Sequence, residues 1–251
     1  MHQPPTLNTL YRLWAALIPV QLAVIVGAIG LLVGATGAIT ILLLRGDIPL
    51  VPLSGEEPYD PSKGGIAPTF TPEVQFWSPY ILRWSATYGV DPNILATVIQ
   101  IESCGHYLVS SPVGAQGLFQ VMPFHFAAGE DMLDPETNAR RGIAYLIGGL
   151  ERADGHIGLA MAGYNGGWGM IPKGWGAWAQ ETRNYYVWGS SIYRDALAGK
   201  RLEESEGLQS WLNAGGNRLC RWAASVLPLA TPNANLTPLP PPTPTPLPTP
   251  G

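Results

Sequence analysis

The sequence predicts a mainly α-helical domain that follows an apolar segment and precedes a proline-rich tail. Apolar and aromatic residues recur at three- and four-residue spacing through the middle of the 251-residue chain, and strand-like alternation is nearly absent. Asp91-Pro92 and Asp134-Pro135 each have the form of a helix N-cap followed by a first-turn proline. Residues 13–44 contain no charged side chain and are almost wholly apolar.

Residues 1–12 are a short N-terminal segment, and residues 13–44 are predicted to be a transmembrane anchor. At about 1.5 Å rise per residue, a helix of this length exceeds a hydrocarbon core of about 30 Å. A cleaved signal peptide, processed near Ala35-Thr36-Gly37-Ala38, is the alternative, but its apolar region would span roughly 7–15 residues. Arg12 and Arg45 flank the run, so the positive-inside rule gives no orientation.

Composition divides the remaining chain into three parts. Residues 45–72 are rich in proline, glycine, serine and acids, which predicts an extended linker. Residues 73–227 are the only segment able to bury a core. Residues 228–251 are rich in proline and threonine, a composition that favours polyproline II and disorder.

Charge and metal-ligand spacing exclude some classes of function. The net charge is −4 and no basic patch is interleaved with aromatic residues, so nucleic acid is not an expected partner. His106, His125 and His156 are isolated in sequence and are expected to be structural or exposed, so no metal and no cofactor are predicted. Cys104 and Cys220 form either a disulfide or two separate buried thiols, and the sequence leaves both open.

Helical periodicity places the elements in order. The expected helices are an amphipathic one containing Phe76 to Tyr88, one that starts at Pro92 and reaches Glu102, one opened by Asp134-Pro135 with its apolar face from Ala139 to Leu150, a shorter one over 157–164, and a longer one over about 177–197. A small irregular hairpin is expected within 104–122, where small residues indicate loops or turns.

Glu102 is an acid where a helix would normally place a hydrophobic residue. Ile94, Val98 and Glu102 are four apart, so the carboxyl lies at the end of an apolar stripe. A carboxylic acid held against apolar side chains has a raised pKa, which suits a general acid working near neutral pH. The alternative is a glutamate that reaches solvent where the helix ends.

Four motifs follow one another along the chain: Glu102-Ser103, then the run from Gly117 to Pro123, then Gly163-Tyr164-Asn165-Gly166-Gly167, then the run from Glu181 to Tyr185. This order resembles the transglycosylase SLT domain of bacterial lytic transglycosylases, which is similar in fold to goose-type lysozyme. The resemblance covers roughly residues 76–198 and implies a lysozyme-like helical domain. Phe119 stands where the family usually has Met, and Gly163 stands where it usually has Ala.

The resemblance implies a peptidoglycan-cleaving enzyme. Glu102 would protonate the oxygen of the β-1,4 bond between N-acetylmuramic acid and N-acetylglucosamine. It would then remove a proton from the muramyl C6 hydroxyl, which attacks C1 and closes a 1,6-anhydro ring. No motif places Glu130, Asp131 or Asp134 opposite Glu102, and the resemblance implies that the substrate's N-acetyl group replaces a second carboxylate.

The resemblance also implies substrate-binding roles for the other motif residues. Gln120 and Asn165 would bind acetamido groups, and Tyr164 would orient Glu102 through its hydroxyl. Asn165 is otherwise a turn residue before two glycines, and Ser103 is otherwise a helix-end hydrogen bonder. Glu181 is expected to orient groove residues, and Tyr185 is expected to pack against or hydrogen-bond toward the catalytic region. One of Trp168 and Trp175, with Trp168 preferred, is expected to contact glycan.

Three functions remain possible on this basis. The leading one is a lytic transglycosylase held in the cytoplasmic membrane by a single span, with its domain outside and with glycan strands and the lipid bilayer as partners. The second is a hydrolase of goose-type lysozyme kind, in which water replaces the C6 hydroxyl. The third is a non-catalytic wall-binding scaffold in an envelope complex whose other members are unknown.

Overall fold

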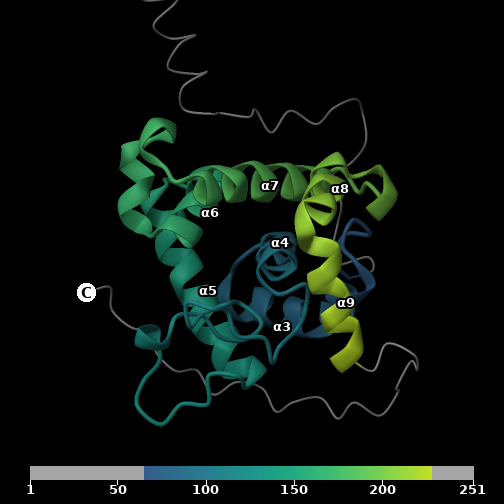
Figure 1. Ribbon diagram of the computed structural model, residues 1–251, viewed down its shortest axis with the longest axis horizontal. Coiled ribbons are helices and arrows are strands. Elements are labelled where there is room, and N and C mark those ends of the chain that lie inside the picture. The colour runs from purple at the N-terminus through teal and green to yellow at the C-terminus, as the bar shows by residue number, and fades with distance from the viewer. Residues whose placement is uncertain (1–64, 228–251) are drawn as a thin grey trace, which may run out of the picture. The chain divides into compact units, whose positions relative to one another are not determined.

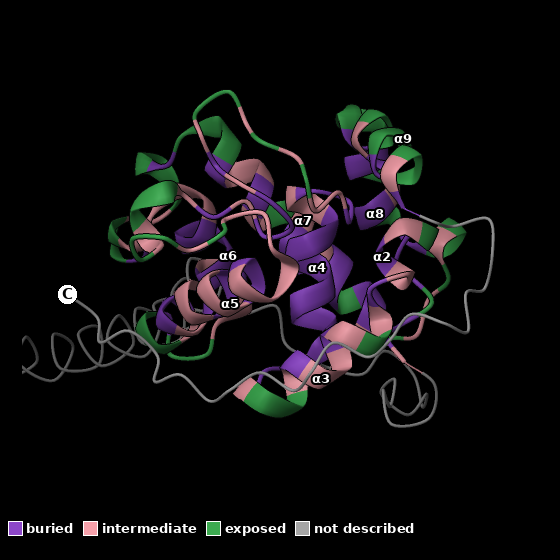
Figure 2. Ribbon diagram, turned by 90° about the horizontal axis from the view of Figure 1, so that it is seen from below, coloured by how far each residue is buried: buried purple, intermediate pink, exposed green. Residues whose placement is uncertain are grey.

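Helix α4 (Pro92–Glu102) lies at the centre of the part of the chain that the computed structural model describes, residues 65–227 (Figure 1). Nine consecutive residues from Pro92 to Gln100 are buried, and Figure 2 shows the helix enclosed by its neighbours. The Asp91 side chain accepts a hydrogen bond from the Asn93 backbone N–H at 2.7 Å, so the predicted cap is confirmed. A helix covered on every face can hold its last residue in a fixed position.

Other helices pack around α4, some in direct contact with it and some through a neighbouring helix. Helix α4 packs against α3 (Ser78–Tyr88) and α7 (Gln180–Leu197). Helix α6 (Ile157–Gly166) packs on both α5 (Pro135–Arg152) and α7. The predicted cap of α5 is confirmed, because Asp134 accepts from the Thr137 backbone N–H, and α6 is capped by the ring nitrogen of His156. Of the two longer helices that contact α4 directly, α3 has a proline in its first turn, and neither α3 nor α7 has a side-chain cap.

Short elements complete the fold. They are α2 (Pro72–Gln75), the 3₁₀ turns η2 (Pro123–His125), η3 (Trp168–Lys173), η4 (Trp175–Ala177) and η5 (Leu202–Glu204), α8 (Glu206–Trp211), the π-helical segment η6 (Leu212–Gly216) and α9 (Asn217–Val226). Within residues 65–227, strand-like pairing is limited to the isolated bridges Ser110–Gln116 and Gln116–Val121. The mainly α-helical prediction is confirmed, and the expected hairpin within 104–122 is reduced to these two bridges.

The predicted linker ends earlier than residue 72. Ile66, Ala67 and Phe70 are buried in the core, and the Ala67 backbone N–H donates to the Asn93 side chain at 2.9 Å. The segment from 66 to 71 is thus part of the domain, although proline and glycine around it gave it the composition of a linker. Other boundaries also differ, because α7 begins at Gln180 instead of near residue 177, and the helices α8 and α9 were not predicted.

The predicted anchor (13–44), most of the linker and the proline-rich tail (228–251) lie outside the described residues. Among residues 65–227, no helix combines the length and the apolar character that a membrane span requires.

Candidate active site

Glu102 is the last residue of α4, and its carboxyl is removed from water although the residue keeps some exposure. Burial raises the pKa of this carboxyl to about 8. A hydrogen-bonding influence from Tyr185 opposes the rise, and the negative charge of Glu181 adds to it. Glu102 is therefore partly buried and not freely solvated at the helix end, and the raised pKa favours its protonated form at neutral pH.

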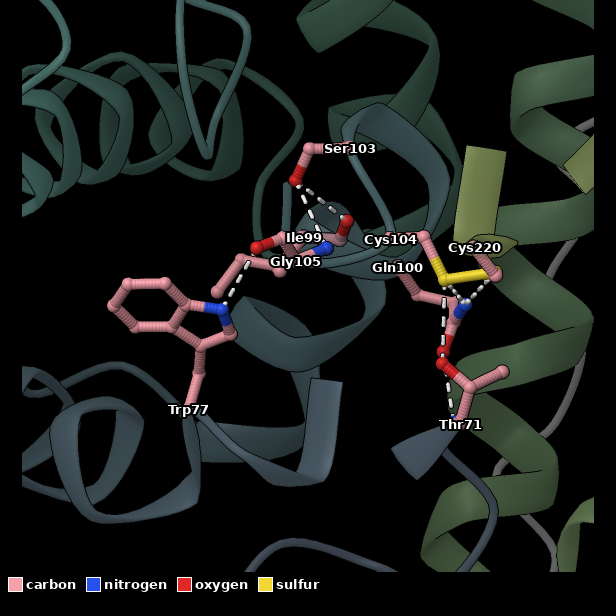
Figure 3. Close-up of a disulfide and its surroundings, with 8 residues drawn as sticks. All are labelled: Thr71, Trp77, Ile99, Gln100, Ser103, Cys104, Gly105 and Cys220. Atoms are coloured by element: carbon pink, nitrogen blue, oxygen red, sulfur yellow. Dashed lines mark hydrogen bonds between the residues drawn. A yellow bond between two sulfur atoms is a disulfide. The ribbon is translucent and has the colours of Figure 1, made fainter. Parts of the chain in front are cut away.

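The turn that follows Glu102 is fixed by hydrogen bonds to other segments. Ser103 Oγ donates to the Leu118 carbonyl at 2.7 Å and accepts from the Gly105 backbone N–H at 3.1 Å. Trp77 Nε1 donates to the Gly105 carbonyl at 2.9 Å (Figure 3). Ser103 is wholly buried, which corrects its assignment to substrate binding: its hydroxyl shapes this turn.

A disulfide joins this turn to α9. Cys104 and Cys220 are bonded, with their Cα atoms 5.0 Å apart, so the two separate thiols left open by the sequence are excluded. Buried Gln100 links the bridge to α4: its Nε2 donates to Cys104 Sγ at 3.1 Å, and its Oε1 accepts from the Thr71 backbone N–H at 3.1 Å (Figure 3). Cys104 has a left-handed backbone (φ 48°), a costly conformation for a residue other than glycine.

Gln120 lies in the loop between α4 and α5 and also has a left-handed backbone (φ 47°). Its Nε2 donates to the carbonyls of Gly117 (2.9 Å) and Val109 (3.1 Å), so the N–H groups of this side chain hold the loop. Both donors of the amide are used in this way. The side-chain oxygen is what Gln120 can still offer to an acetamido N–H.

Asn138 of α5 organises the same loop and was missed by the sequence analysis. Its Nδ2 donates to the carbonyls of Gln116 (2.7 Å) and Met132 (2.9 Å), and its Oδ1 accepts from the Phe119 backbone N–H (2.8 Å). Asn138 is wholly buried. The signal was present, because Asn138 lies four residues before Gly142 on the apolar face of its helix.

The two departures from the family pattern are matched by close packing. Phe119 is wholly buried, and a Cβ on Gly142 would lie 2.5 Å from Phe119 Cβ, so the missing side chain of Gly142 makes room for the large ring. Likewise a Cβ on Gly163 would lie 2.7 Å from Ile171 Cδ1. The substitutions therefore change the packing behind the site and leave the acid in place.

Tyr164 and Tyr185 stack with their ring centroids 6.3 Å apart beside Glu102, and the carboxyl contributes to raising the pKa of both. The Tyr164 hydroxyl donates to the Phe119 carbonyl at 2.8 Å, so its proton is not directed at Glu102 as expected. Among the described residues, the buried Tyr185 hydroxyl makes no hydrogen bond of ordinary length. It still lies near enough to Glu102 to influence the pKa of that carboxyl by hydrogen bonding. Tyr185 is thus the tyrosine whose hydroxyl is free to serve Glu102.

Asn165 and Glu181 lie together where α6 ends and α7 begins. Asn165 Oδ1 accepts from the Thr182 hydroxyl at 2.9 Å, and Asn165 Nδ2 contacts Glu181 Oε1 at 3.5 Å. Asn165 lies within α6, whose range ends at Gly166. Glu181 is exposed and acts on Glu102 through its charge. Among the described carboxylates, Glu181 is the one whose charge raises the pKa of Glu102. The motif spacing did not predict this influence.

The acids considered as second carboxylates are engaged elsewhere. Glu130 pairs with Arg140 and Arg141, and hydrogen bonding with Arg141 is the main cause that lowers the pKa of Glu130 to about 2. Asp134 caps α5, and Asp131 accepts from the Leu133 backbone N–H at 3.0 Å. The sequence-based exclusion of these three acids agrees with their positions.

Trp168 and Trp175 differ in what they leave available. Trp168 stacks on Tyr145 with centroids 4.7 Å apart, carries the Arg152 guanidinium 3.8 Å above its ring, and donates to the Tyr145 carbonyl at 3.2 Å. Trp175 is 50% exposed. Trp175 also packs against Trp178 and Tyr186, with ring centroids 5.9 Å apart in each case, but leaves more of its surface to solvent than Trp168 does. The packing on both faces of Trp168 disfavours the prediction that this residue contacts glycan.

Comparison with known proteins shows what the region carrying this site is similar to. Residues 79–186 match the family model of the transglycosylase SLT domain. The transglycosylase of Enterobacteria phage PRD1 is 36% identical over 117 residues, which cover 45% of this chain and 40% of that protein. Endo-type membrane-bound lytic murein transglycosylase A of Klebsiella pneumoniae is 33% identical over 99 residues, with coverage of 32% and 48%. The matched region includes every predicted site residue.

Two further comparisons give matches of lower sequence identity. Membrane-bound lytic murein transglycosylase C of Yersinia pestis is 29% identical over 115 residues, with coverage of 37% of this chain and 32% of that protein. A solved structure of an inactive mutant of lytic transglycosylase Slt from Pseudomonas aeruginosa has a TM-score of 0.36 at 21% identity, and the match covers 56% of this chain and 24% of that one. The chain thus spans less than half the length of these curated relatives.

Proposed function

We propose that the chain is a peptidoglycan lytic transglycosylase, on the premise that residues 79–186 match the family model of the transglycosylase SLT domain. The bond that it cleaves is the β-1,4 link from N-acetylmuramic acid to N-acetylglucosamine. The relatives named above are lytic murein transglycosylases or, in the phage, a transglycosylase. The three motifs downstream of Glu102 lie on segments that converge on it.

The observation that carries the proposal is the raised pKa of Glu102, about 8, caused mainly by burial. At neutral pH the carboxyl holds its proton and can give it to the glycosidic oxygen as the bond breaks. The carboxylate left behind is then the base that removes a proton from the muramyl C6 hydroxyl, which attacks C1. Because one group performs both steps, its pKa has to lie near ambient pH.

Around this acid, we assign roles by what each polar group has left to offer. The Tyr185 hydroxyl can donate to the carboxylate in the second step, since it lacks a partner at full distance. Gln120 offers its side-chain oxygen to an acetamido N–H. Asn165 is held by Thr182 and Glu181 and can present its amide to the acetamido group that supports positive charge at C1.

The acid role is tested by comparing Glu102→Gln with Glu203→Gln, a change at an exposed glutamate. Both are prepared as the full chain in detergent and incubated with purified peptidoglycan. We expect Glu102→Gln to lose on the order of 10²–10⁴-fold in rate, while Glu203→Gln retains the wild-type rate. Unchanged activity in Glu102→Gln would remove the acid from the mechanism.

The masses of the released fragments distinguish a transglycosylase from a hydrolase. Closure of the 1,6-anhydro ring gives muramyl ends that lack one water relative to hydrolysis products. Products heavier by one water, with free reducing ends, would instead identify a goose-type lysozyme-like hydrolase. Binding of wild-type protein to peptidoglycan without release of fragments would indicate a wall-binding scaffold.

We further propose that residues 13–44 anchor the chain in the cytoplasmic membrane with the domain outside. The anchor composition supports this, and two of the relatives are named membrane-bound. The proposal predicts that the chain stays with membranes after high-salt and alkaline washes and is released by detergent. It also predicts digestion of the domain by protease added to spheroplasts, and protection of the domain would contradict the orientation.

A further inference from the structure

A row of aromatic rings leads away from Glu102 toward the surface. Tyr185 stacks with Tyr164 (centroids 6.3 Å apart), and Tyr164 contacts Tyr145 edge-on at 5.5 Å. Tyr145 then contacts His125 at 4.6 Å, and His125 contacts Phe124 at 4.5 Å. The five rings come from α7, α6, α5 and η2, so elements distant in sequence contribute to one continuous row.

Exposure rises along the row. Tyr185 is 4% exposed and Tyr164 is 9% exposed, Tyr145 and His125 are partly buried, and Phe124 is 75% exposed. The row thus begins at the proposed acid and ends at a phenylalanine that faces solvent. A large aromatic side chain left in water keeps a sizeable apolar area unburied.

The segment that presents Phe124 is tied down. Glu130 accepts from Arg140 at 2.7 Å and from Arg141 at 2.8 and 2.9 Å, and both arginines belong to α5. The same carboxylate accepts from the Ala127 backbone N–H at 2.9 Å. The low pKa of Glu130 keeps these ion pairs charged at neutral pH. The segment after Phe124 is therefore tied to α5, which limits the backbone entropy lost when Phe124 binds a ligand.

We propose that Phe124 is an outer sugar-binding platform, on which a hexosamine ring of the glycan strand stacks, one or more residues away from the bond at Glu102. Sugar rings have apolar C–H faces that suit the face of an aromatic ring. The inference rests on the proposed function, because the packed rings connect the segment of Phe124 to the tyrosines beside the acid, and Phe124 is the most exposed ring of the row. Phe124 would then contribute to binding of the strand and leave the bond-breaking step to Glu102.

The size of the patch argues for a glycan and against a second copy of the chain. The exposed neighbours of Phe124 along the segment are Pro123, Ala127, Ala128 and Gly129, all small or short. An aromatic side chain contributes about 150–250 Å², whereas a stable protein interface buries about 800 Å² on each partner. One ring among small residues matches one sugar ring.

The test measures binding in a Glu102→Gln background, so that the strand is not cut. The full chain in detergent is sedimented with purified glycan strands freed of peptides. We expect Phe124→Ala to raise the apparent Kd on the order of three- to tenfold, the range for one aromatic contact. Phe124→Trp should retain binding, and Val113→Ala, at another exposed apolar residue (77%), should leave the Kd unchanged.

Turnover of the same strands provides the second readout. With Glu102 restored, Phe124→Ala should raise KM and leave kcat unchanged, because the platform lies away from the reacting atoms. Equal Kd values for Phe124→Ala and Val113→Ala would overturn the platform. So would a wild-type dimer in sedimentation that Phe124→Ala dissociates. The proposed function fails separately, through activity in Glu102→Gln, whatever Phe124 does.

Discussion

Tyr185 of α7 and Glu102 of α4 influence each other across the candidate site. The tyrosine lowers the pKa of the carboxyl through hydrogen bonding, while the carboxyl raises the pKa of the tyrosine. Burial is the larger influence on both groups. The tyrosine thus favours the carboxylate without overcoming the loss of water, so the acid is neutral before the reaction and the base is stabilised after it.

Removing the Tyr185 hydroxyl should therefore move the pH profile upward. Tyr185→Phe takes away an influence that lowers the pKa of Glu102, so that pKa should rise above about 8. A general acid is active while protonated, so the alkaline limb of kcat/KM should move to higher pH. Rates of glycan release measured between pH 6 and 10 test this prediction.

Tyr193→Phe is the matched control for this measurement. Tyr193 lies two helical turns further along α7, and its hydroxyl donates to Asp91 at 3.3 Å. Its loss should lower stability and leave the alkaline limb in place. If both variants shift the profile equally, the tyrosine beside Glu102 has no specific influence on its protonation.

Glu181→Gln should move the same limb in the opposite direction. The charge of Glu181 raises the pKa of Glu102, so its removal should lower that pKa and bring the alkaline limb to lower pH. Glu181 is exposed, so added salt should weaken the influence in the wild-type protein and reduce the difference between the two profiles. A Glu181→Gln profile identical to wild type at low salt would contradict the assignment.

The position of Glu102 at the end of an apolar stripe was predictable because the residues that reveal it lie on the same helix. Ile94 and Val98 lie on the same helix, and helical periodicity alone puts the acid at the end of their stripe. The helices from Pro92 and Pro135 follow from capping signals that the chain carries within a few residues. Helix α9 carries a weaker signal, since it has no side-chain cap and is joined to α8 through the irregular segment at Gly215. Helix α8 has a Ser205 cap that the sequence analysis missed.

Roles that depend on contacts distant in sequence were not predictable in the same way. Gln120 and Ser103 belong to motifs, yet their hydrogen bonds go to backbone groups that only the fold brings near. Trp168 and Trp175 look equivalent in a glycine- and tryptophan-rich run, and only the packing of Tyr145 and Arg152 on Trp168 separates them. Residue type gives the chemistry available, and burial decides whether it faces a ligand.

Glu102 should also reduce stability at alkaline pH. The pKa of Glu102 is about 8 in the folded chain and 4.5 for a free glutamate, so between these pH values the folded state holds more protons than the unfolded state. The free energy of unfolding must therefore fall as pH rises from about 4.5 to about 8. Glu102→Gln, which cannot ionise, should be more stable than wild type by roughly 2–4 kcal/mol at pH 9.

The measurement is urea unfolding of both proteins at pH 4.5 and pH 9, followed by tryptophan fluorescence. The stability difference should be small at pH 4.5, where Glu102 is neutral in the folded state and only about half ionised in the unfolded state, and should grow toward pH 9. A difference of equal size at both pH values would indicate that glutamine acts through packing or hydrogen bonding and not through ionisation.

The disulfide between Cys104 and Cys220 should hold the turn after Glu102 in its active arrangement. The bridge spans 116 residues, so its removal should lower the free energy of unfolding by about 2–5 kcal/mol. Cys104 has a left-handed backbone and adjoins Ser103, which bonds to the Gln120 loop at Leu118. Reduction should therefore also lower kcat at temperatures well below unfolding. Titration with dithiothreitol, followed by thermal melts and turnover, measures both effects.

The variant with both Cys104→Ser and Cys220→Ser should match the reduced protein and should not respond to dithiothreitol. If that variant is less stable yet turns over glycan at the wild-type rate, the bridge stabilises the fold without positioning the acid.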